Sequence, residues 1–227
     1  MSDRSAPHAS LSRDDHAFIF ETIPENSRVL DLGCGTGDLL GALVEEKLVF
    51  GRGVEISADG VAACVSRGLS VYHGDINEGL SEWTDGSFDY VLLNQTLHEI
   101  QRPLFVLTEM LRVGDVGIVG FPNYGYLPVR LYLLFSGRMP ATTDIPYAWD
   151  DTPNIHPFTL RDFDTLLDRM DLSVIRRKHL PETGVVPSFI RGVLPNSLAK
   201  NCVYLIGKKR PSVGDSAGPE RDIRRCT

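Results

Sequence analysis

A glycine-rich segment between a strand-like run and a helix-like run constrains most strongly how this chain can fold. The segment RVLDLGCGTGDLL covers residues 28–40 and has glycine at positions 33, 35 and 37. The apolar residues before the glycines are typical of a strand, and the leucines after them are typical of a helix. Glycine permits backbone conformations that other residues avoid and lets a ligand approach the backbone closely. The segment therefore predicts a strand, a tight ligand-binding turn and a helix in direct succession.

Strand-like and helix-like segments alternate over most of the chain. Short apolar runs predict seven strands, over residues 29–32, 49–55, 69–73, 88–93, 116–121, 172–178 and 202–206. Most of the first five runs are nearly continuous in apolar residues, as in parallel strands that are buried on both faces. Helical stripes fall between them, including one that begins at Pro103 and one that follows a capping-box pattern at Thr159 and Asp162. This alternation predicts a doubly wound, Rossmann-like α/β fold.

One internal region breaks the alternation, and both ends of the chain differ from its middle in composition. Residues 1–15 are polar without a clear period, which predicts a flexible N-terminal arm. Residues 208–227 are rich in charge, glycine, serine and proline, which predicts a disordered tail. The domain between them, residues 16–207, contains an insertion at about 122–158, directly after the fifth strand. Ligands bind at this edge of a doubly wound sheet, so the insertion is expected to be a lid or a docking surface.

Charge and composition narrow the possible partners. The chain of 227 residues has 30 acidic and 23 basic residues, and its net charge of −7 disfavours nucleic acid as the main partner. The N-terminal residues lack the apolar core of a signal peptide, and the apolar run 129–135 is too short to span a membrane. The four cysteines form no CxxC pair, and Asp150 and Asp151 are typical of a solvated turn, so no metal site is predicted. A cytoplasmic protein with no membrane partner is expected.

Acidic residues around the glycine loop bear on which ligand it binds. Dinucleotide-binding enzymes use G-x-G-x-x-G and place a pyrophosphate at the helix N-terminus. Here the spacing is G-x-G-x-G after Asp31, and a carboxylate suits an ammonium or a sulfonium better than a pyrophosphate. Glu55, which ends the second strand, can accept hydrogen bonds from the ribose of either ligand. Asp75, after the third strand, can accept from an adenine amino group.

Four motifs together resemble those of class I S-adenosylmethionine-dependent methyltransferases over roughly residues 25–121. They are DLGCGTG, Glu55, Gly74-Asp75 and SFDYVLLNQTLH. The resemblance implies a seven-stranded sheet with an antiparallel last strand, and S-adenosylmethionine or S-adenosylhomocysteine as the cofactor. It also implies a role for each matched residue. The methionine part would lie by Asp31, Gly33, Cys34, Gly35, Gly37 and Asn94, the ribose by Glu55, and the adenine by Gly74 and Asp75, between Ile56 and Ile76.

A second resemblance, to the MetW proteins of methionine biosynthesis, covers about residues 28–180. It is carried by RVLDLGCGTGDLL, GVEIS-x-x-GV-x-x-C-x-x-RG, SFDYVLLNQTL, RP-x-x-VL-x-EMLRVG, FPN-x-G, GRMP and DTPNIH. Several of these motifs lie outside the cofactor loops. The family is associated with homoserine O-acyltransferase, so the resemblance implies a cofactor-binding accessory protein that binds and activates that enzyme. A catalytic S-adenosylmethionine-dependent methyltransferase for a small molecule is the alternative function.

The alternative function requires residues that position a methyl acceptor. Methyl transfer mainly requires alignment of the attacking atom, and a general base helps when that atom belongs to a hydroxyl or an ammonium. The titratable candidates near the expected mouth of the site are His98 and Glu99, after the fourth strand, and His156 in the insertion. His98 or His156 is the candidate for positioning the acceptor. Local hydrogen bonding at a helix start is the alternative role for His98, and loop structure is the alternative for His156.

The accessory function requires a surface that binds the partner enzyme. The segment YLPVRLYLLFSGRMP in the insertion is apolar and basic, and its candidate interface residues are Arg130, Leu131, Leu134 and Phe135. Aromatic residues and arginine are the types that most often anchor protein interfaces. Packing of this helix-like piece on its own domain is the alternative.

Overall fold

The computed structural model describes residues 13–140, 148–181 and 194–209 of the chain. The predicted arm over residues 1–15 lies largely outside these ranges, but its last two residues, Asp14 and Asp15, begin helix α1. Of the predicted tail over 208–227, two residues are described, and the first of them, Lys208, ends the last strand.

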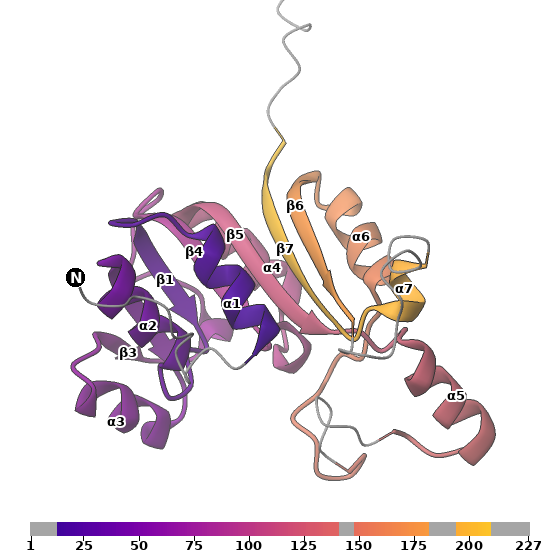
Figure 1. Cartoon of the computed structure of the whole chain (residues 1–227). Coiled ribbons are helices and arrows are strands. Elements are labelled where there is room, and N and C mark those ends of the chain that lie inside the picture. Colours follow the sequence, from indigo (N-terminus) through magenta and orange to yellow (C-terminus); the bar gives the residue numbers. More distant parts are fainter. Residues whose placement is uncertain (1–12, 141–147, 182–193, 210–227) are drawn as a thin grey trace, which may run out of the picture.

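All seven predicted strands are present and form one sheet (Figure 1). They are β1 (Arg28–Leu32), β2 (Phe50–Glu55), β3 (Val71–His73), β4 (Phe88–Asn94), β5 (Gly114–Pro122), β6 (Leu172–Leu180) and β7 (Asn201–Lys208). Their order across the sheet is β3-β2-β1-β4-β5-β7-β6. Strands β1 to β5 pair in parallel, and β7 pairs antiparallel with both β5 and β6. The predicted α/β fold with an antiparallel last strand is confirmed.

Helices cover both faces of this sheet. They are α1 (Asp14–Thr22), α2 (Asp38–Lys47), α3 (Ala58–Ser66), α4 (Pro103–Val113), α5 (Leu127–Ser136), α6 (Leu160–Arg169) and α7 (Pro195–Leu198). Two short 3-10 turns, η2 (Ile76–Glu78) and η3 (Leu97–Glu99), follow β3 and β4. Among the described residues, no helix is both long enough and apolar enough to cross a membrane.

Neighbouring residues of the central strands are buried on opposite faces of the sheet. Val29 of β1 and Leu92 of β4 belong to the apolar cluster that includes the buried residues of α1 and α2. Leu30 and Val91, one position away in each strand, belong to the cluster that includes the buried residues of α4 and α6. Side chains alternate between faces along a strand, so a strand covered on both sides must be apolar at nearly every position. This explains why the continuous apolar runs predicted these strands correctly.

Local signals in the sequence set the starts of two helices. Pro103 is the first residue of α4, where its missing amide hydrogen leaves no helical hydrogen bond unmade. Thr159 caps α6 in the predicted capping box: its hydroxyl accepts from the Asp162 amide at 3.4 Å, and the Asp162 carboxylate accepts from the Thr159 amide at 2.9 Å. These contacts satisfy amide groups that the first helical turn leaves without partners.

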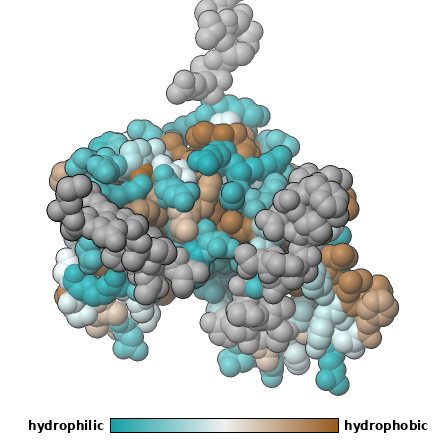
Figure 2. Space-filling model, viewed as in Figure 1, coloured by the Kyte–Doolittle hydropathy of each residue, from teal (hydrophilic) through white to brown (hydrophobic). Residues whose placement is uncertain are grey.

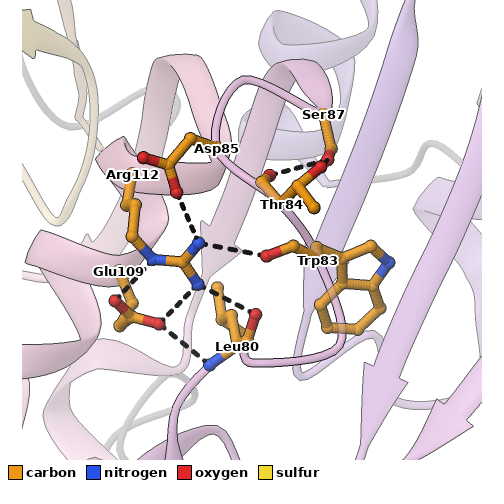
Figure 3. Close-up of polar contacts among 7 residues, drawn as sticks. All are labelled: Leu80, Trp83, Thr84, Asp85, Ser87, Glu109 and Arg112. Atoms are coloured by element: carbon orange, nitrogen blue, oxygen red, sulfur yellow. Dashed lines mark hydrogen bonds and ion pairs between the residues drawn. The ribbon is translucent and has the colours of Figure 1, made fainter.

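The arginine of the EMLRVG motif fastens the loop before β4 to helix α4 (Figure 3). The Arg112 guanidinium donates to both carboxylate oxygens of Glu109 and to the carboxylate of Asp85, each at 2.8 Å. It also donates to the backbone carbonyls of Leu80 and Trp83, at 3.0 Å each. Glu109 in turn accepts from the Leu80 amide at 3.2 Å. This part of the motif therefore has a structural role, away from the glycine loop.

The insertion after β5 begins at a buried asparagine and continues into an exposed helix. Asn123 donates to the carbonyls of Asn196 and Ala199, at 3.0 and 2.8 Å, and accepts from the amides of Gly125 and Leu160. Helix α5 follows and projects away from the sheet (Figure 1). Its one buried residue is Val129, and hydrophobic side chains gather on the surface at the position of α5 (Figure 2).

Candidate functional site

The glycine loop joins β1 to α2 through three left-handed residues. Gly33, Gly35 and Gly37 have φ values of 73°, 55° and 76°, which residues with a side chain rarely adopt. The amides of Gly33 and Cys34 donate to the Val54 carbonyl at 2.8 and 3.1 Å, which ties the loop to β2. A Cβ atom added to Gly33 or Gly37 would meet packed side chains, but one added to Gly35 would project into open space. The loop therefore has an open surface at Gly35.

Two buried carboxylates beside the loop differ in their hydrogen bonding. Glu55, at the end of β2, accepts from the amides of Gly35 and Ser57, each at 2.8 Å. Asp31 of β1 is 4% exposed and accepts no hydrogen bond from the described residues. Its burial, and then the negative charge of Glu55, raise the pKa of Asp31 to about 7. A buried carboxylate without a donor is unfavourable unless a cation or a proton reaches it.

A third carboxylate lies beyond β3, on the far side of Glu55. One oxygen of Asp75 accepts from the amide and the side chain of Asn77, at 2.8 and 2.9 Å. The other accepts no hydrogen bond from the described residues. Ile56, which is 64% exposed, and Ile76, which is buried, contribute apolar surface to the same wall. A flat ring with an amino group fits this combination of an apolar surface and a free acceptor.

The carboxyl end of β4 forms the opposite wall. Asn94 donates to the Asp15 carboxylate at 3.0 Å, and its Oδ1 atom is buried without a partner among the described residues. Space for this side chain exists because residue 120 is glycine, where a Cβ atom would lie 1.9 Å from the Asn94 oxygen. The Asn94 side chain therefore fills the space beside Gly120, and its amide nitrogen holds Asp15.

The carboxylates and the loop surround a cavity of about 460 Å³. This volume lies within the range of about 300–1,000 Å³ that is typical of small-molecule sites. Ten of the eleven predicted cofactor residues line it: Asp31, Gly33, Cys34, Gly35, Glu55, Ile56, Gly74, Asp75, Ile76 and Asn94. The eleventh, Gly37, caps the start of α2 and is not in the cavity wall.

Several residues of the cavity wall were not predicted from the sequence. The main ones are Arg13 and His16 from the N-terminal segment, and Gln95 and Thr96 after β4; Glu99, a titratable candidate from the sequence, also lies in the wall. The apolar residues Phe18, Ile19 and Ile23, which pack in the core, were the available signal that a helix lies at the start of the domain.

The thiol in the glycine loop is protonated. The Cys34 sulfur lies 3.9 Å from the Cys64 sulfur in α3. Burial, followed by the charge of Asp31, raises the pKa of the Cys34 thiol well above its usual range. Reactive cysteines have lowered pKa values, so the contribution of Cys34 to the site is shape rather than nucleophilic chemistry.

The two candidate catalytic histidines lie next to each other but outside the cavity wall. The carbonyl of His98 accepts from the amides of Ile155 and His156, at 2.8 and 2.9 Å. The His98 ring is buried, and this burial lowers its pKa to about 4. The His156 ring lines a separate apolar pocket with Leu97 and Phe163. An acceptor-positioning role for either histidine stays a prediction.

The predicted interface residues lie on the exposed surface of α5. Leu131, Leu134 and Phe135 are 41%, 72% and 82% exposed, and Arg130 is exposed as well. In the described ranges, no group of three or more His, Cys, Asp or Glu side chains could hold a metal ion.

Solved structures with similar folds include S-adenosylmethionine-dependent methyltransferases. One from Archaeoglobus fulgidus matches with a TM-score of 0.61 and 18% identity, covering 86% of this chain and 92% of that one. Another from Thermotoga maritima, described as a possible histamine N-methyltransferase, matches with a TM-score of 0.59 and 21% identity, covering 89% and 90%. At this level of identity the likeness shows the fold alone.

Relatives in sequence point to methionine biosynthesis. The chain is 26% identical to a demethylmenaquinone methyltransferase of Bacillus licheniformis over 56% of its own length and 62% of the relative. It is 37% identical over 169 residues to the bifunctional methionine biosynthesis protein MetXA/MetW of Rhodopirellula baltica, covering 70% of this chain and 27% of that protein. The chain thus spans less than two thirds of either relative. The family model described as methionine biosynthesis protein MetW matches residues 13–206. The chain therefore belongs to the MetW family of methionine biosynthesis proteins.

Proposed function

We propose that this chain is an accessory protein of methionine biosynthesis that binds S-adenosylmethionine or S-adenosylhomocysteine and associates with homoserine O-acyltransferase. Membership of the MetW family supports the pathway, and the cytoplasm is the expected compartment. The observation that most supports this choice of ligand is the cavity in which Asp31 has no hydrogen-bond donor among the described residues.

The chemistry of the cavity wall fits a cationic nucleoside. Asp31 lacks a donor within the described residues, so it suits the ammonium of the methionine part. Glu55 would accept hydrogen bonds from the ribose hydroxyls, and Asp75 with its apolar neighbours would contact the adenine. S-adenosylmethionine, when bound, supplies a methyl group on a sulfonium, whereas S-adenosylhomocysteine has none to transfer. A pyrophosphate would meet several carboxylates here, which disfavours a dinucleotide.

The partner proposal is supported by a fused relative and by an exposed helix. The Rhodopirellula baltica relative is named for both a MetXA and a MetW part. Parts that are fused in one organism are often partners in another, and here the other part is the acyltransferase. Helix α5 exposes consecutive apolar side chains from Leu131 to Phe135, and apolar patches of this kind mark protein contacts. Arg130, Tyr132 and Phe135 are of the residue types that anchor interfaces.

The cavity and the insertion that carries α5 are linked by backbone hydrogen bonds. Turn η3 contains Glu99 of the cavity wall and His98, whose carbonyl holds the insertion at Ile155 and His156. We propose that ligand binding alters the acyltransferase complex through this link. The bound nucleoside would then report the level of the end product of the pathway.

The partner proposal is tested by mixing the purified chain with homoserine O-acyltransferase. Co-elution and a changed rate of acyl transfer are expected, and the absence of both would remove the proposal. Gly35→Val tests the ligand site in the same assay, because the side chain is strained at a positive φ and fills the open surface of the loop. Gly68→Val is the matched control, since Gly68 also has a positive φ and open space but lies outside the cavity wall.

Methyl transfer to a small molecule is the second proposal. The observation that favours it is Glu99, a cavity-wall carboxyl whose pKa is raised by burial and by Glu55. A carboxyl with a raised pKa can accept a proton from an acceptor group. Release of S-adenosylhomocysteine with candidate amine or hydroxyl acceptors, lost in Glu99→Gln, would support this function. Equal turnover by wild type, Glu99→Gln, His98→Ala and His156→Ala would mean that none of these residues takes part.

A further inference from the structure

The cavity wall is acidic. Its carboxylates belong to Asp31, Asp38, Glu55, Asp75 and Glu99, and Asp38 is paired with Arg67 at 2.7 Å. In the wall formed by described residues, Arg13 is the one lysine or arginine. The proposed ligands carry an α-carboxylate beside their ammonium group. An anion in a wall of carboxylates needs a local cation to bind favourably. Arg13 is therefore the available partner for that carboxylate.

We propose that Arg13, held in position by Asp15, binds the α-carboxylate of the ligand and makes the protein specific for nucleosides with an amino-acid tail. This inference rests on the proposed function, since it assigns one end of the same ligand. It gives helix α1 a role in recognition, with Arg13 as the specificity residue and Asp15 as the positioning residue.

Asp15 connects the start of α1 to the end of β4. Its carboxylate is 4% exposed and accepts from Nε and Nη2 of Arg13, at 3.1 and 2.6 Å. It also accepts from the side-chain nitrogens of Asn94 and Gln95, at 3.0 and 3.3 Å, and from the amide of His16 at 3.0 Å. All three of Asn94, Gln95 and His16 are in the cavity wall. The buried carboxylate therefore holds the arginine beside these residues of the wall.

Arg13 keeps donors available after pairing with Asp15. Its Nη1 atom donates to no described residue, and a guanidinium has five N–H donors in a fixed plane. The side chain is 51% exposed and belongs to the cavity wall, so the free donors are accessible from the cavity. His16 adds a ring nitrogen that is buried without a partner among the described residues.

The strand order sets the direction in which the ligand would lie. Strand β1 lies between β2 and β4, and β3 lies beyond β2. The adenine position at Asp75 follows β3, whereas Asn94 and the Asp15 contacts lie at the end of β4. The ligand would thus cross the ends of the strands with its amino-acid part at β4. The carboxylate then reaches the end of the cavity where Arg13 lies.

The test compares two ligands that differ in the amino-acid tail. S-adenosylhomocysteine has the carboxylate, and 5′-methylthioadenosine keeps the nucleoside and the sulfur without it. We expect Arg13→Gln in the full chain to weaken S-adenosylhomocysteine binding about 10- to 100-fold, which is the usual effect of losing charge-assisted hydrogen bonds. Binding of 5′-methylthioadenosine is expected to change less than about twofold, and Arg13→Lys is expected to lie between wild type and Arg13→Gln.

Two further variants separate recognition from structure. Asp15→Asn should weaken S-adenosylhomocysteine more than 5′-methylthioadenosine, because it releases Arg13 from the wall. Arg161→Gln, on the exposed start of α6, is the matched control and should bind both ligands as wild type does. If Arg13→Gln weakens both ligands equally, or neither, the specificity role is wrong even though the cavity binds the nucleoside. Failure of the wild-type chain to bind S-adenosylhomocysteine would instead overturn the proposed function.

Discussion

At the scale of single residues, the two carboxylates next to the glycine loop have different surroundings. Glu55 is held by two backbone amides, and Asp31 has no donor among the described residues. The difference arises because β1 and its neighbours are buried on both faces, so the Asp31 side chain meets apolar packing except where it borders the cavity. Asp31 is thus the residue that most needs a cation from the ligand.

Binding of S-adenosylhomocysteine is expected to weaken as the pH falls below about 7. The raised pKa of Asp31, about 7, means that the ligand-free protein is half protonated there at that pH. The ligand ammonium favours the carboxylate, so binding below pH 7 releases a proton and loses up to about tenfold in affinity per pH unit. Calorimetry between about pH 8 and pH 5.5 measures this effect. The affinity of wild type is expected to change with pH, and the affinity of Asp31→Asn is expected to stay constant. Equal pH dependence in the two proteins would contradict the role of Asp31 in binding the ammonium.

The raised pKa of Asp31 affects the stability of the ligand-free chain in the opposite direction, so the free energy of unfolding is expected to fall as the pH rises. The folded-state pKa of Asp31 is raised from 3.8 to about 7, so the folded state binds more protons than the unfolded state between these values. The contribution of Asp31 to the free energy of unfolding is full below about pH 4 and is lost as the pH rises through 7. Denaturant midpoints of wild type relative to Asp31→Asn should therefore fall over this interval.

At the scale of elements, the loop before β4 and helix α5 are attached to the rest of the molecule in different ways. Arg112 holds the loop before β4 by three hydrogen bonds, to Leu80, Trp83 and Asp85, and is itself held by two more to Glu109 of the same helix. Helix α5 is instead anchored by Val129 and, ahead of it, by the buried Asn123, and the rest of the helix is exposed. The first arrangement stabilises the fold, and the second leaves a surface for a partner.

Arg112→Met is expected to lower the free energy of unfolding by about 2–4 kcal/mol, because it leaves Glu109 and two backbone carbonyls without their donor. Urea denaturation followed by circular dichroism measures the change. Arg161→Met is the control, and a change of less than about 0.5 kcal/mol is expected at this exposed position. A loss of less than about 1 kcal/mol for Arg112→Met would mean that the network in Figure 3 contributes little.

The double variant Arg130→Asp and Leu134→Asp is expected to weaken the acyltransferase complex at least about tenfold, since it places charge in an apolar interface. Affinity for S-adenosylhomocysteine should stay as in wild type, because neither residue lines the cavity. Size-exclusion chromatography and calorimetry of the two proteins measure both effects. Ile175→Asp on β6 is the matched control, since Ile175 is an exposed apolar residue, 57% accessible, on another element. A complex that survives the double variant would place the interface elsewhere.

At the scale of the whole molecule, the sequence predicted what local patterns determine. The central strands β1, β4 and β5 were predictable because strands covered on both faces must be apolar at nearly every position, whereas β3 and β6 are exposed edge strands. The glycine loop was predictable because three left-handed residues at alternate positions, 33, 35 and 37, favour glycine. The capping box at Thr159 was predictable because it is a contact between residues three positions apart.

The residues that the sequence did not predict depend on contacts between distant segments. Asp15 and Asn94 are 79 positions apart, so no local pattern indicated that the N-terminal segment would reach β4. His98 does follow β4 as predicted, but turn η3 directs its ring into the interior, where burial lowers its pKa to about 4. Position along the chain therefore located the end of the strand but not the direction of the side chain.

Isothermal titration of the full-length chain with S-adenosylhomocysteine, and separately with NADH, tests most directly whether the acidic cavity selects a cationic nucleoside. Saturable binding of one S-adenosylhomocysteine per chain, weakened in Asp31→Asn, with no heat of binding for NADH, is the expected result. Tight binding of NADH together with no response to S-adenosylhomocysteine would contradict it.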